Sequence, residues 1–295
     1  MTRIAILSDI HANLFALDAV YQDLQQQQPD EILIGGDLVG RGPQGDAVVQ
    51  FIKEQGWRSV KGNHEDYLLN FHHRRIPTDW LTDPVWSASR WMAAELSSES
   101  IDFIENIPFS LRPNLDPMTF LTHGTPRSNQ EGIGSWTPAE QLSELTAEFA
   151  QGETLVVGHT HRPVLLDYAG ITIVNTGSVG LPFNGDWRAQ YVILNRTDDN
   201  TPQEVEFRQV EYDRDAFLQH YKDSGFLAEG GITSALLYQE LLCARPFLVP
   251  YLRWAEALGK NVDMLTVEEF LEFYDCNLSM EELFKLFHEL VALGK

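Results

Sequence analysis

Short apolar runs recur along the chain before residue 212, and a cluster of polar residues follows most of them. The run at residues 4–7 has four apolar side chains in succession and predicts a strand that is buried on both faces. The spacing of apolar residues after it predicts an amphipathic helix, which Asn13 caps and Pro29 stops. Strands that alternate with helices are typical of an α/β fold.

Further elements follow the same pattern. Strands are expected at residues 32–34, 59–60, 118–122, 155–157, 191–194 and 205–210, with a hairpin at residues 164–174. A capping box at Thr137–Glu140 should open a helix that runs to residue 150. Residues 66–117 place Trp80, Trp86 and Trp91 among polar residues, and we expect packed helices there that frame the site.

The pattern from residue 212 onward is helical. Thr266–Glu269 and Ser279–Glu282 are two capping boxes, and each opens an amphipathic run. We therefore predict an α/β domain at residues 1–212 and a helical C-terminal extension at residues 213–295. The extension holds no cluster of ligand-type residues, and we expect it to pack on the core, cover the site or mediate formation of a homo-oligomer.

Candidate chemistry is concentrated where the predicted strands end. In α/β sheets, ligands gather at the carboxyl ends of the strands, and five of the nine histidines lie there. The ligand-type residues at these ends are Asp9, His11, Asp37, Asn63, His64, His123, His159 and His161. A single Asp-x-His pair recurs by chance, whereas a series of such clusters at successive strand ends does not. His159 and His161 alternate, so in a regular strand their side chains would share a face.

This set offers oxygen and nitrogen donors and no thiolate. It suits Mn, Fe, Zn, Co or Ni better than a calcium or magnesium cage. The candidates are too many for one four-coordinate ion and fit two. Two ions about 3.5–4 Å apart can hold the attacking and leaving oxygens of a phosphoryl displacement and lower the pKa of a bridging water. We therefore expect two divalent transition-metal ions, with manganese as the first choice.

Charge narrows the choice of partners. The 295-residue chain has a formal net charge of −22 at pH 7, and such a surface repels nucleic acids, so no nucleic-acid partner is expected. A small phosphorylated substrate needs a local source of positive charge, which bound metal ions supply.

The expected location follows from three other features of the sequence. No stretch approaches the ~20 apolar residues that span a bilayer, and the start of the chain does not resemble a signal peptide. Cys243 and Cys276 form no C-x-x-C pair, and we expect reduced thiols. These features predict a cytoplasmic protein with no membrane partner.

The order of the polar clusters resembles that of a known family. The blocks are Asp9-x-His11, Gly36-Asp37, Gly62-Asn63-His64-Glu65, His123-Gly124 and Gly158-His159-Thr160-His161. In this order they resemble the calcineurin-like metallophosphoesterase superfamily, and the stretch Gly177–Pro182 further resembles its small bacterial phosphodiesterase branch. The resemblance implies a four-layer α/β/β/α sandwich with two mixed β-sheets, here followed by the C-terminal helical appendage.

The resemblance also implies roles for individual residues. One metal ion would be held by Asp9, His11 and His161. The other would be held by Asn63, His123 and His159, with Asp37 bridging the two ions. His64 would not be a ligand but a catalytic residue that contacts the phosphate and donates a proton to the leaving oxygen.

The second block departs from the protein serine/threonine phosphatases. There it reads Gly-Asp-x-Val-Asp-Arg-Gly, and its second aspartate orients the catalytic histidine. Gly40 occupies that position here, which weakens a protein-phosphatase interpretation and leaves His64 without its orienting group, unless Glu65 or a backbone carbonyl serves. Arg41 is retained, either as a catalytic-site ligand for phosphate oxygens or as an exposed structural arginine.

These features lead to the hypothesis of a dimetal-dependent phosphohydrolase. It would hydrolyse a small phosphorylated substrate, a phosphodiester or a nucleotide, by in-line attack of a metal-bridging hydroxide. The alternatives are a dinucleoside polyphosphate hydrolase, a protein phosphatase-like monoesterase and a non-catalytic scaffold of the same fold.

Overall fold

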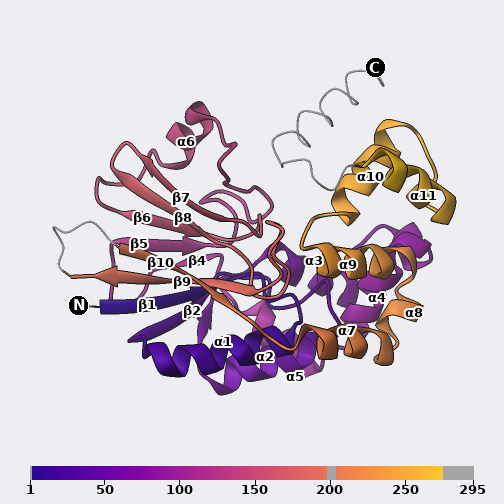
Figure 1. Cartoon of the computed structure of the whole chain (residues 1–295), viewed down its shortest axis with the longest axis horizontal. Coiled ribbons are helices and arrows are strands. Elements are labelled where there is room, and N and C mark those ends of the chain that lie inside the picture. Colours follow the sequence, from indigo (N-terminus) through magenta and orange to yellow (C-terminus); the bar gives the residue numbers. More distant parts are fainter. Residues whose placement is uncertain (1, 198–203, 275–295) are drawn as a thin grey trace.

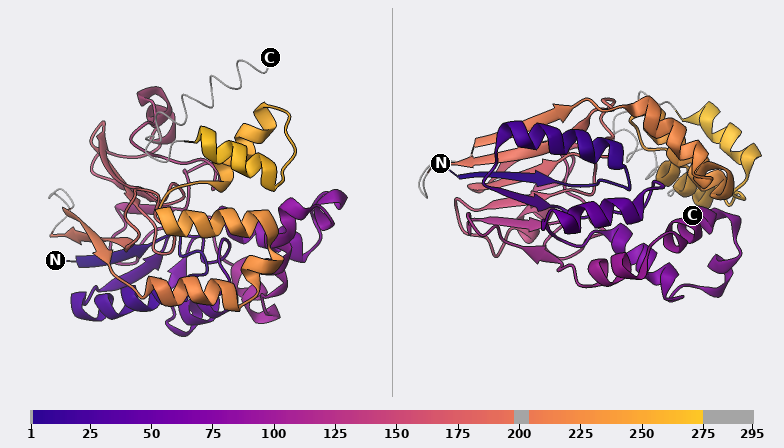
Figure 2. Two further views of the ribbon diagram at one scale, coloured as in Figure 1. Left: turned by 45° about the vertical axis from the view of Figure 1, so that its right-hand side comes forward. Right: turned by 90° about the horizontal axis from the view of Figure 1, so that it is seen from below.

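The computed structural model describes residues 2–197 and 204–274. Two five-stranded β-sheets pack against each other, and helices cover their outer faces (Figure 1). The strands gather at one end of the molecule and the C-terminal helices lie at the other (Figure 2). This architecture confirms the predicted four-layer α/β/β/α sandwich with a helical appendage.

The first sheet is built around the apolar run at the start of the chain. Its order is β10 (Glu204–Val210), β9 (Ala189–Arg196), β1 (Thr2–Leu7), β2 (Glu31–Ile34) and β3 (Arg58–Ser59). β1, β2 and β3 are parallel, because helices connect them, whereas β9 and β10 run antiparallel to their neighbours. The sheet is therefore mixed.

The second sheet is mixed as well. Its order is β4 (Ser110–Leu111), β5 (Thr119–Thr122), β6 (Thr154–Val157), β8 (Ile171–Thr176) and β7 (Pro163–Tyr168). β5, β6 and β8 are parallel, and β4 and β7 are antiparallel edge strands. β7 and β8 form the predicted hairpin, whereas β4 lies in a region that was predicted to be helical.

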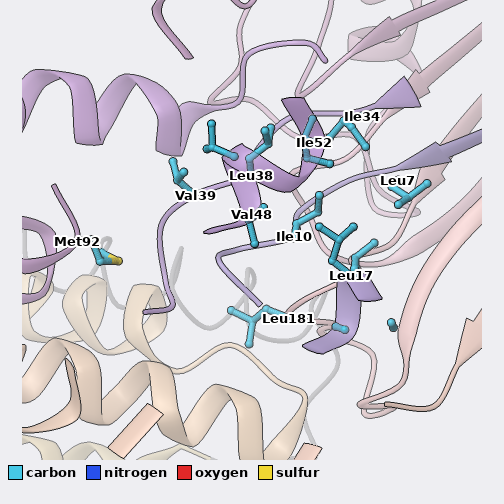
Figure 3. Close-up of a cluster of buried hydrophobic side chains, with 14 of the residues drawn as sticks. Leu7, Ile10, Leu17, Ile34, Leu38, Val39, Val48, Ile52, Met92 and Leu181 are labelled. Atoms are coloured by element: carbon cyan, nitrogen blue, oxygen red, sulfur yellow. The ribbon is translucent and has the colours of Figure 1, made fainter. Parts of the chain in front are cut away.

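Alternation along β1 places its side chains in two different cores. Ile4 and Ile6 belong to the cluster between the two sheets, together with Leu121 of β5. Ala5 and Leu7 belong to the cluster on the face that the helices cover (Figure 3). Burial on both faces explains why this strand is apolar throughout.

Helices close both outer faces of the sandwich. α1 (Leu14–Gln27) and α2 (Gly45–Glu54) contribute buried residues to the core on the outer face of the first sheet. α6 (Ala139–Leu145) covers the second sheet, where Leu142 and Leu145 pack with residues of β6 and β8.

The ends of two of these helices test the predicted caps. Asn13 caps α1 as expected, with its side-chain oxygen accepting the Ala16 N–H at 3.0 Å. The predicted box at Thr137–Glu140 was wrong, because the Thr137 hydroxyl accepts the Gly134 N–H instead of capping α6. α6 also ends at Leu145 rather than near residue 150.

Residues 66–117 are mainly helical, as predicted. They contain most of α3 (Asn63–His72), two 3-10 turns η1 (Thr78–Leu81) and η2 (Pro84–Trp86), α4 (Ser87–Ala94) and α5 (Ser98–Glu105). Trp80 stacks on Trp86 with ring centroids 3.7 Å apart, and Trp91 packs on Phe226 of a C-terminal helix.

The helical extension continues the core of the α/β domain. Its helices are α7 (Arg214–Asp223), α8 (Phe226–Glu229), α9 (Gly231–Cys243), α10 (Leu248–Ala257) and α11 (Met264–Phe273). Buried residues of α7, α8 and α9 belong to the same hydrophobic cluster as α1, α2 and α4, and α8 and α9 lie beside α4 (Figure 1). α10 and α11 form a second, smaller cluster.

The predicted starts of the last helices are only partly covered by the structure. α11 begins at Met264, and its capping box pairs Asp263 with Thr266, so the predicted box at Thr266–Glu269 was wrong by three positions. The box at Ser279–Glu282 lies outside the described residues. Within the described residues, no helix is both long enough and apolar enough to cross a membrane.

The shared core predicts how the extension unfolds. Phe226 is fully buried between Trp91 and Tyr221, so Phe226→Ala should lower the free energy of unfolding by about 3–5 kcal/mol. In chemical denaturation followed by circular dichroism, the main transition should move to lower denaturant.

Leu242→Ala, at a leucine of α9 that is 42% exposed, is the matched control and should leave the transition in place. An early, separate transition in Phe226→Ala with an unchanged main one would show that the extension is an independent unit.

Candidate metal centre

The strand ends of both sheets deliver the predicted ligand-type residues to one place. Asp9 and His11 follow β1, Asp37 follows β2, and His123 follows β5. Asn63 is the first residue of α3, directly after the third parallel strand of the first sheet. The carboxyl edges of the two sheets thus supply one site.

Tight turns aim these side chains inward. Five ligand-type residues have left-handed backbone, with φ between 50° and 66°: Asp9, His11, Asp37, His159 and His161. Such φ values are unfavourable for residues with a Cβ atom, by about 1–3 kcal/mol each, and cluster at functional sites. His159 and His161 lie in the loop after β6 and not in a regular strand, so the shared face that alternation gives in a strand does not apply to them.

One group of donor atoms consists of Asp9, His11 and His161. The Nε2 atoms of the two histidines are 3.0 Å apart, and Asp9 Oδ1 lies 3.3 Å from Nε2 of His161. Asp9 Oδ1 is buried and accepts no hydrogen bond from the described residues. A buried carboxylate oxygen that is left without a donor is costly unless a cation satisfies it.

A second group consists of Asn63, His123 and His159. The side-chain oxygen of Asn63 lies 2.9 Å from Nδ1 of His159 and 3.1 Å from Nε2 of His123. Asp37 lies between the two groups, with Oδ2 3.3 Å from Nε2 of His123 and 3.6 Å from Nε2 of His11.

Backbone carbonyls fix the orientation of three imidazoles. The Nδ1 atoms of His11, His123 and His161 face the carbonyl oxygens of residues 39, 35 and 181 at 3.3, 2.8 and 2.6 Å. When Nδ1 donates a hydrogen bond to a carbonyl, the lone pair of Nε2 is directed to the centre, which is the usual arrangement of metal-ligating histidines. With the bare carboxylate oxygen of Asp9, this arrangement fits divalent metal ions held by nitrogen and oxygen.

The charges of the centre perturb one another strongly. Burial alone would lower the pKa of His123, but the charge and hydrogen bond of Asp37 outweigh it and raise the pKa to about 10. Burial would raise the pKa of Asp37, but His123 and His64 hold it well below its usual range. Burial lowers the pKa of His159 to about 4. In the absence of a cation, the charge of Asp37 thus favours the protonated form of His123.

His64 lies at the edge of this centre, against Gly40. A Cβ atom at Gly40 would lie 2.3 Å from Nδ1 of His64, and Gly40 has a φ of 81°. The absent aspartate is therefore explained, since the imidazole fills its place. Arg41 Nε lies 3.1 Å from Nε2 of His64 and donates to it.

Glu65 does not orient His64. Its carboxylate accepts the N–H groups of Asp37, Leu38 and Val39 at 3.0, 2.8 and 3.3 Å, and that of Gly62 at 2.7 Å. It therefore ties the loop after β2 to the loop before α3. Burial and the nearby charge of Asp37 raise the pKa of Glu65 to about 7, and its hydrogen bonds to backbone amides oppose that shift.

A cavity of about 460 Å³ lies beside the centre, bounded on one side by His159 and on the other by C-terminal helices. Arg41 and Arg253 line it together with the apolar side chains of Trp136 and Phe183. Glu240 of α9 also lines the cavity, although no residue of the extension was predicted to belong to the site. No local pattern marks this single glutamate, because its partners lie far away in the chain.

Three other histidines of the described residues lie outside the candidate centre. His72 and His73 lie at the end of α3, and His73 faces Glu105 at 2.6 Å. His220 packs near Phe15. None of the three belongs to a group of donor atoms among the described residues, and His288 lies outside those residues.

The fold and the donor set together define the class of the protein. Residues 2–199 match the model of the calcineurin-like phosphoesterase superfamily domain. The chain therefore belongs to this superfamily, whose members are metal-dependent phosphoesterases with two-metal sites.

Two known relatives cover most of the chain, and a third matches one segment of it. A metallophosphoesterase structure from Sphaerobacter thermophilus is 28% identical, covers 82% of this chain and 99% of its own, and has a TM-score of 0.64. An uncharacterised protein of Methanocaldococcus jannaschii is 27% identical over 72% of this chain and 88% of its own. A symmetrical bis(5'-nucleosyl)-tetraphosphatase of Psychromonas ingrahamii is 37% identical, over 23% of this chain and 25% of its own.

The clamp made by Glu65 predicts a stability effect. Glu65→Ala leaves four buried or half-buried N–H groups without their acceptor and should lower the free energy of unfolding by about 3 kcal/mol or more. Glu65→Gln keeps one acceptor oxygen and should lose less. Thermal and chemical unfolding of metal-free protein measure both variants, and equal stability of Glu65→Ala and wild type would contradict the clamp.

Proposed function

We propose that the protein is a dimetal-dependent phosphoesterase that hydrolyses a small phosphorylated substrate, a phosphodiester or a nucleotide, by in-line attack of water. The observation that carries this proposal is the pair of donor groups described above, with Asp37 between them. Asp9, His11 and His161 would hold one ion, and Asn63, His123 and His159 the other. When bound, two divalent ions supply a water of lowered pKa and positive charge for the phosphoryl oxygens.

The protein's own residues position the substrate. His64 stands at the mouth of the centre and transfers a proton to the leaving oxygen. Arg41 lines both the centre and the cavity, and its guanidinium binds a phosphate oxygen. The cavity receives the part of the substrate beyond the reacting phosphate.

The choice of metal follows the donor set. Nitrogen and oxygen donors favour manganese, with iron, zinc, cobalt and nickel as alternatives. The acidic surface directs the enzyme toward small substrates rather than nucleic acids, because its net charge of −22 repels polyanions.

A dinucleoside polyphosphate hydrolase is the second candidate. The similarity to a bis(5'-nucleosyl)-tetraphosphatase supports it over one segment of the chain. The two arginines and two aromatic side chains of the cavity offer partners for a further phosphate and a base. A non-catalytic scaffold is disfavoured by the intact donor set.

Hydrolysis of chromogenic esters tests the proposed function. Metal-stripped protein with manganese added back should hydrolyse bis(p-nitrophenyl) phosphate or the matching monoester, and His64→Ala should reduce kcat by about 10²–10⁴-fold. Preference for the diester supports a phosphodiesterase and preference for the monoester a phosphatase.

His72→Ala, an exposed histidine at the far end of α3, is the matched control and should keep wild-type turnover. Full activity in His64→Ala, or in Asp37→Ala, would contradict the proposed roles. Manganese-loaded protein that turns over neither these esters nor nucleotides would favour the scaffold.

The cavity predicts an effect on KM. Arg253→Met should raise KM about tenfold for a nucleotide that has a second anionic group, because a charge-assisted hydrogen bond is lost. KM for p-nitrophenyl phosphate should not change. Arg75→Met, at an exposed arginine outside the cavity, controls for the loss of one charge. Equal effects of Arg253→Met on both substrates would show that Arg253 does not bind the second anionic group.

A further inference from the structure

The C-terminal helices reach the candidate site through one buried carboxylate. Glu240 of α9 is fully buried, and its Oε2 accepts Nη1 of Arg41 at 2.9 Å, across 199 positions of the chain. Its Oε1 accepts the backbone N–H groups of Phe247 and Leu248 at 2.8 and 2.9 Å. One side chain thus joins Arg41 to the start of α10.

Arg41 is held from several sides. Its Nε donates to Nε2 of His64 at 3.1 Å, and its guanidinium lies 5.9 Å from the ring centre of Phe183. The hydroxyl of Tyr221, on α7, donates to the Arg41 carbonyl at 3.0 Å. Arg41 itself has a left-handed backbone, with φ of 62°. These contacts fix the backbone of Arg41 and two nitrogen atoms of its guanidinium, Nε and Nη1. They leave Nη2 for a ligand.

A purely structural role does not account for a charged group at position 240. The two amides at the start of α10 need one acceptor oxygen, which a neutral glutamine provides. A fully buried carboxylate is unfavourable unless a cation pairs with it. The side chain of Arg41 is 13% exposed and is that cation.

We propose that Glu240 is a positioning residue, which holds the Arg41 guanidinium between His64 and the cavity so that it can bind a phosphate oxygen. This role rests on the proposed phosphoesterase function. It makes the helical extension a part of the active site, and it supplies the orientation that the missing aspartate at Gly40 does not. Arg41 contacts His64 as a donor to Nε2 rather than as an acceptor, and Glu240 fixes the guanidinium of Arg41.

Glu240→Gln tests the proposal with little change in shape. Its carbonyl oxygen can keep the N–H groups of Phe247 and Leu248, and its amide nitrogen then faces Arg41, where only an acceptor can bind. Binding of inorganic phosphate to manganese-loaded protein, measured by calorimetry, should weaken about tenfold, as a lost charge-assisted contact predicts. Manganese binding should not change. Glu256→Gln, at an exposed glutamate of α10, is the control.

A double-mutant cycle shows whether Glu240 acts through Arg41. Arg41→Met should also weaken phosphate binding, and adding Glu240→Gln to it should cause no further loss. If Glu240→Gln alone leaves the phosphate Kd at the wild-type value, or weakens it equally with and without Arg41, the proposal is overturned.

A readout independent of metal and turnover is the imidazole of His64. In ¹⁵N NMR of metal-free protein, Glu240→Gln and Arg41→Met should shift the His64 ring signals in the same direction, and Glu256→Gln should not. Unchanged His64 signals in Glu240→Gln would overturn the proposal even if turnover is lost. If Glu240→Gln does not fold, Glu240→Asp keeps the charge but withdraws it by one methylene, and the same shift is expected. If the wild-type protein hydrolyses none of the esters but these shifts are present, the phosphoesterase function is overturned and the contact of Glu240 with Arg41 is not.

Discussion

Close packing of carboxylates and imidazoles at one sheet edge is the constraint on which the rest of the structure depends. Asp9, Asp37 and His123 are almost completely buried, so each polar atom needs a partner inside the protein. The chain supplies backbone carbonyls for the outer imidazole nitrogens and Glu65 for the amides of the loop after β2. Only the inner donor atoms then remain for a cation. The same packing leaves no room for a side chain at Gly62, where a Cβ atom would lie 2.1 Å from Asp37 Oδ1.

Much of the fold and the candidate centre could be predicted from the sequence, because short segments of the chain determine both. A strand buried on both faces needs a continuous apolar run, and residues 4–7 show one. The polar residues that follow each strand are within a few positions of it, so their common edge follows from parallel topology. The structure brings Asp9, His11 and His161 together, and likewise Asn63, His123 and His159, as the resemblance implied. Their roles as ligands stay predictions.

The features that the sequence did not reveal depend on contacts between distant segments or on competition between local ones. Thr137 is of a residue type that often caps helices, but its hydroxyl accepts the N–H of Gly134 instead. The loop that contains His159 and His161 turns through left-handed backbone, and no local sequence pattern predicts that conformation. Glu240 lies in a helix whose sequence pattern indicates only core packing. Its role depends on the ion pair with Arg41, which is 199 positions away in the chain.

The link between Glu240 and Arg41 also sets an order of events during synthesis. All of the ligand-type residues precede α9 in the chain, so they are synthesised before the carboxylate that pairs with Arg41. Until α9 and α10 are made, Arg41 lacks that carboxylate and the cavity lacks one of its walls. A nascent or truncated chain can therefore contain every ligand-type residue and still lack the complete cavity. The C-terminal helices are therefore the last elements needed to complete the cavity.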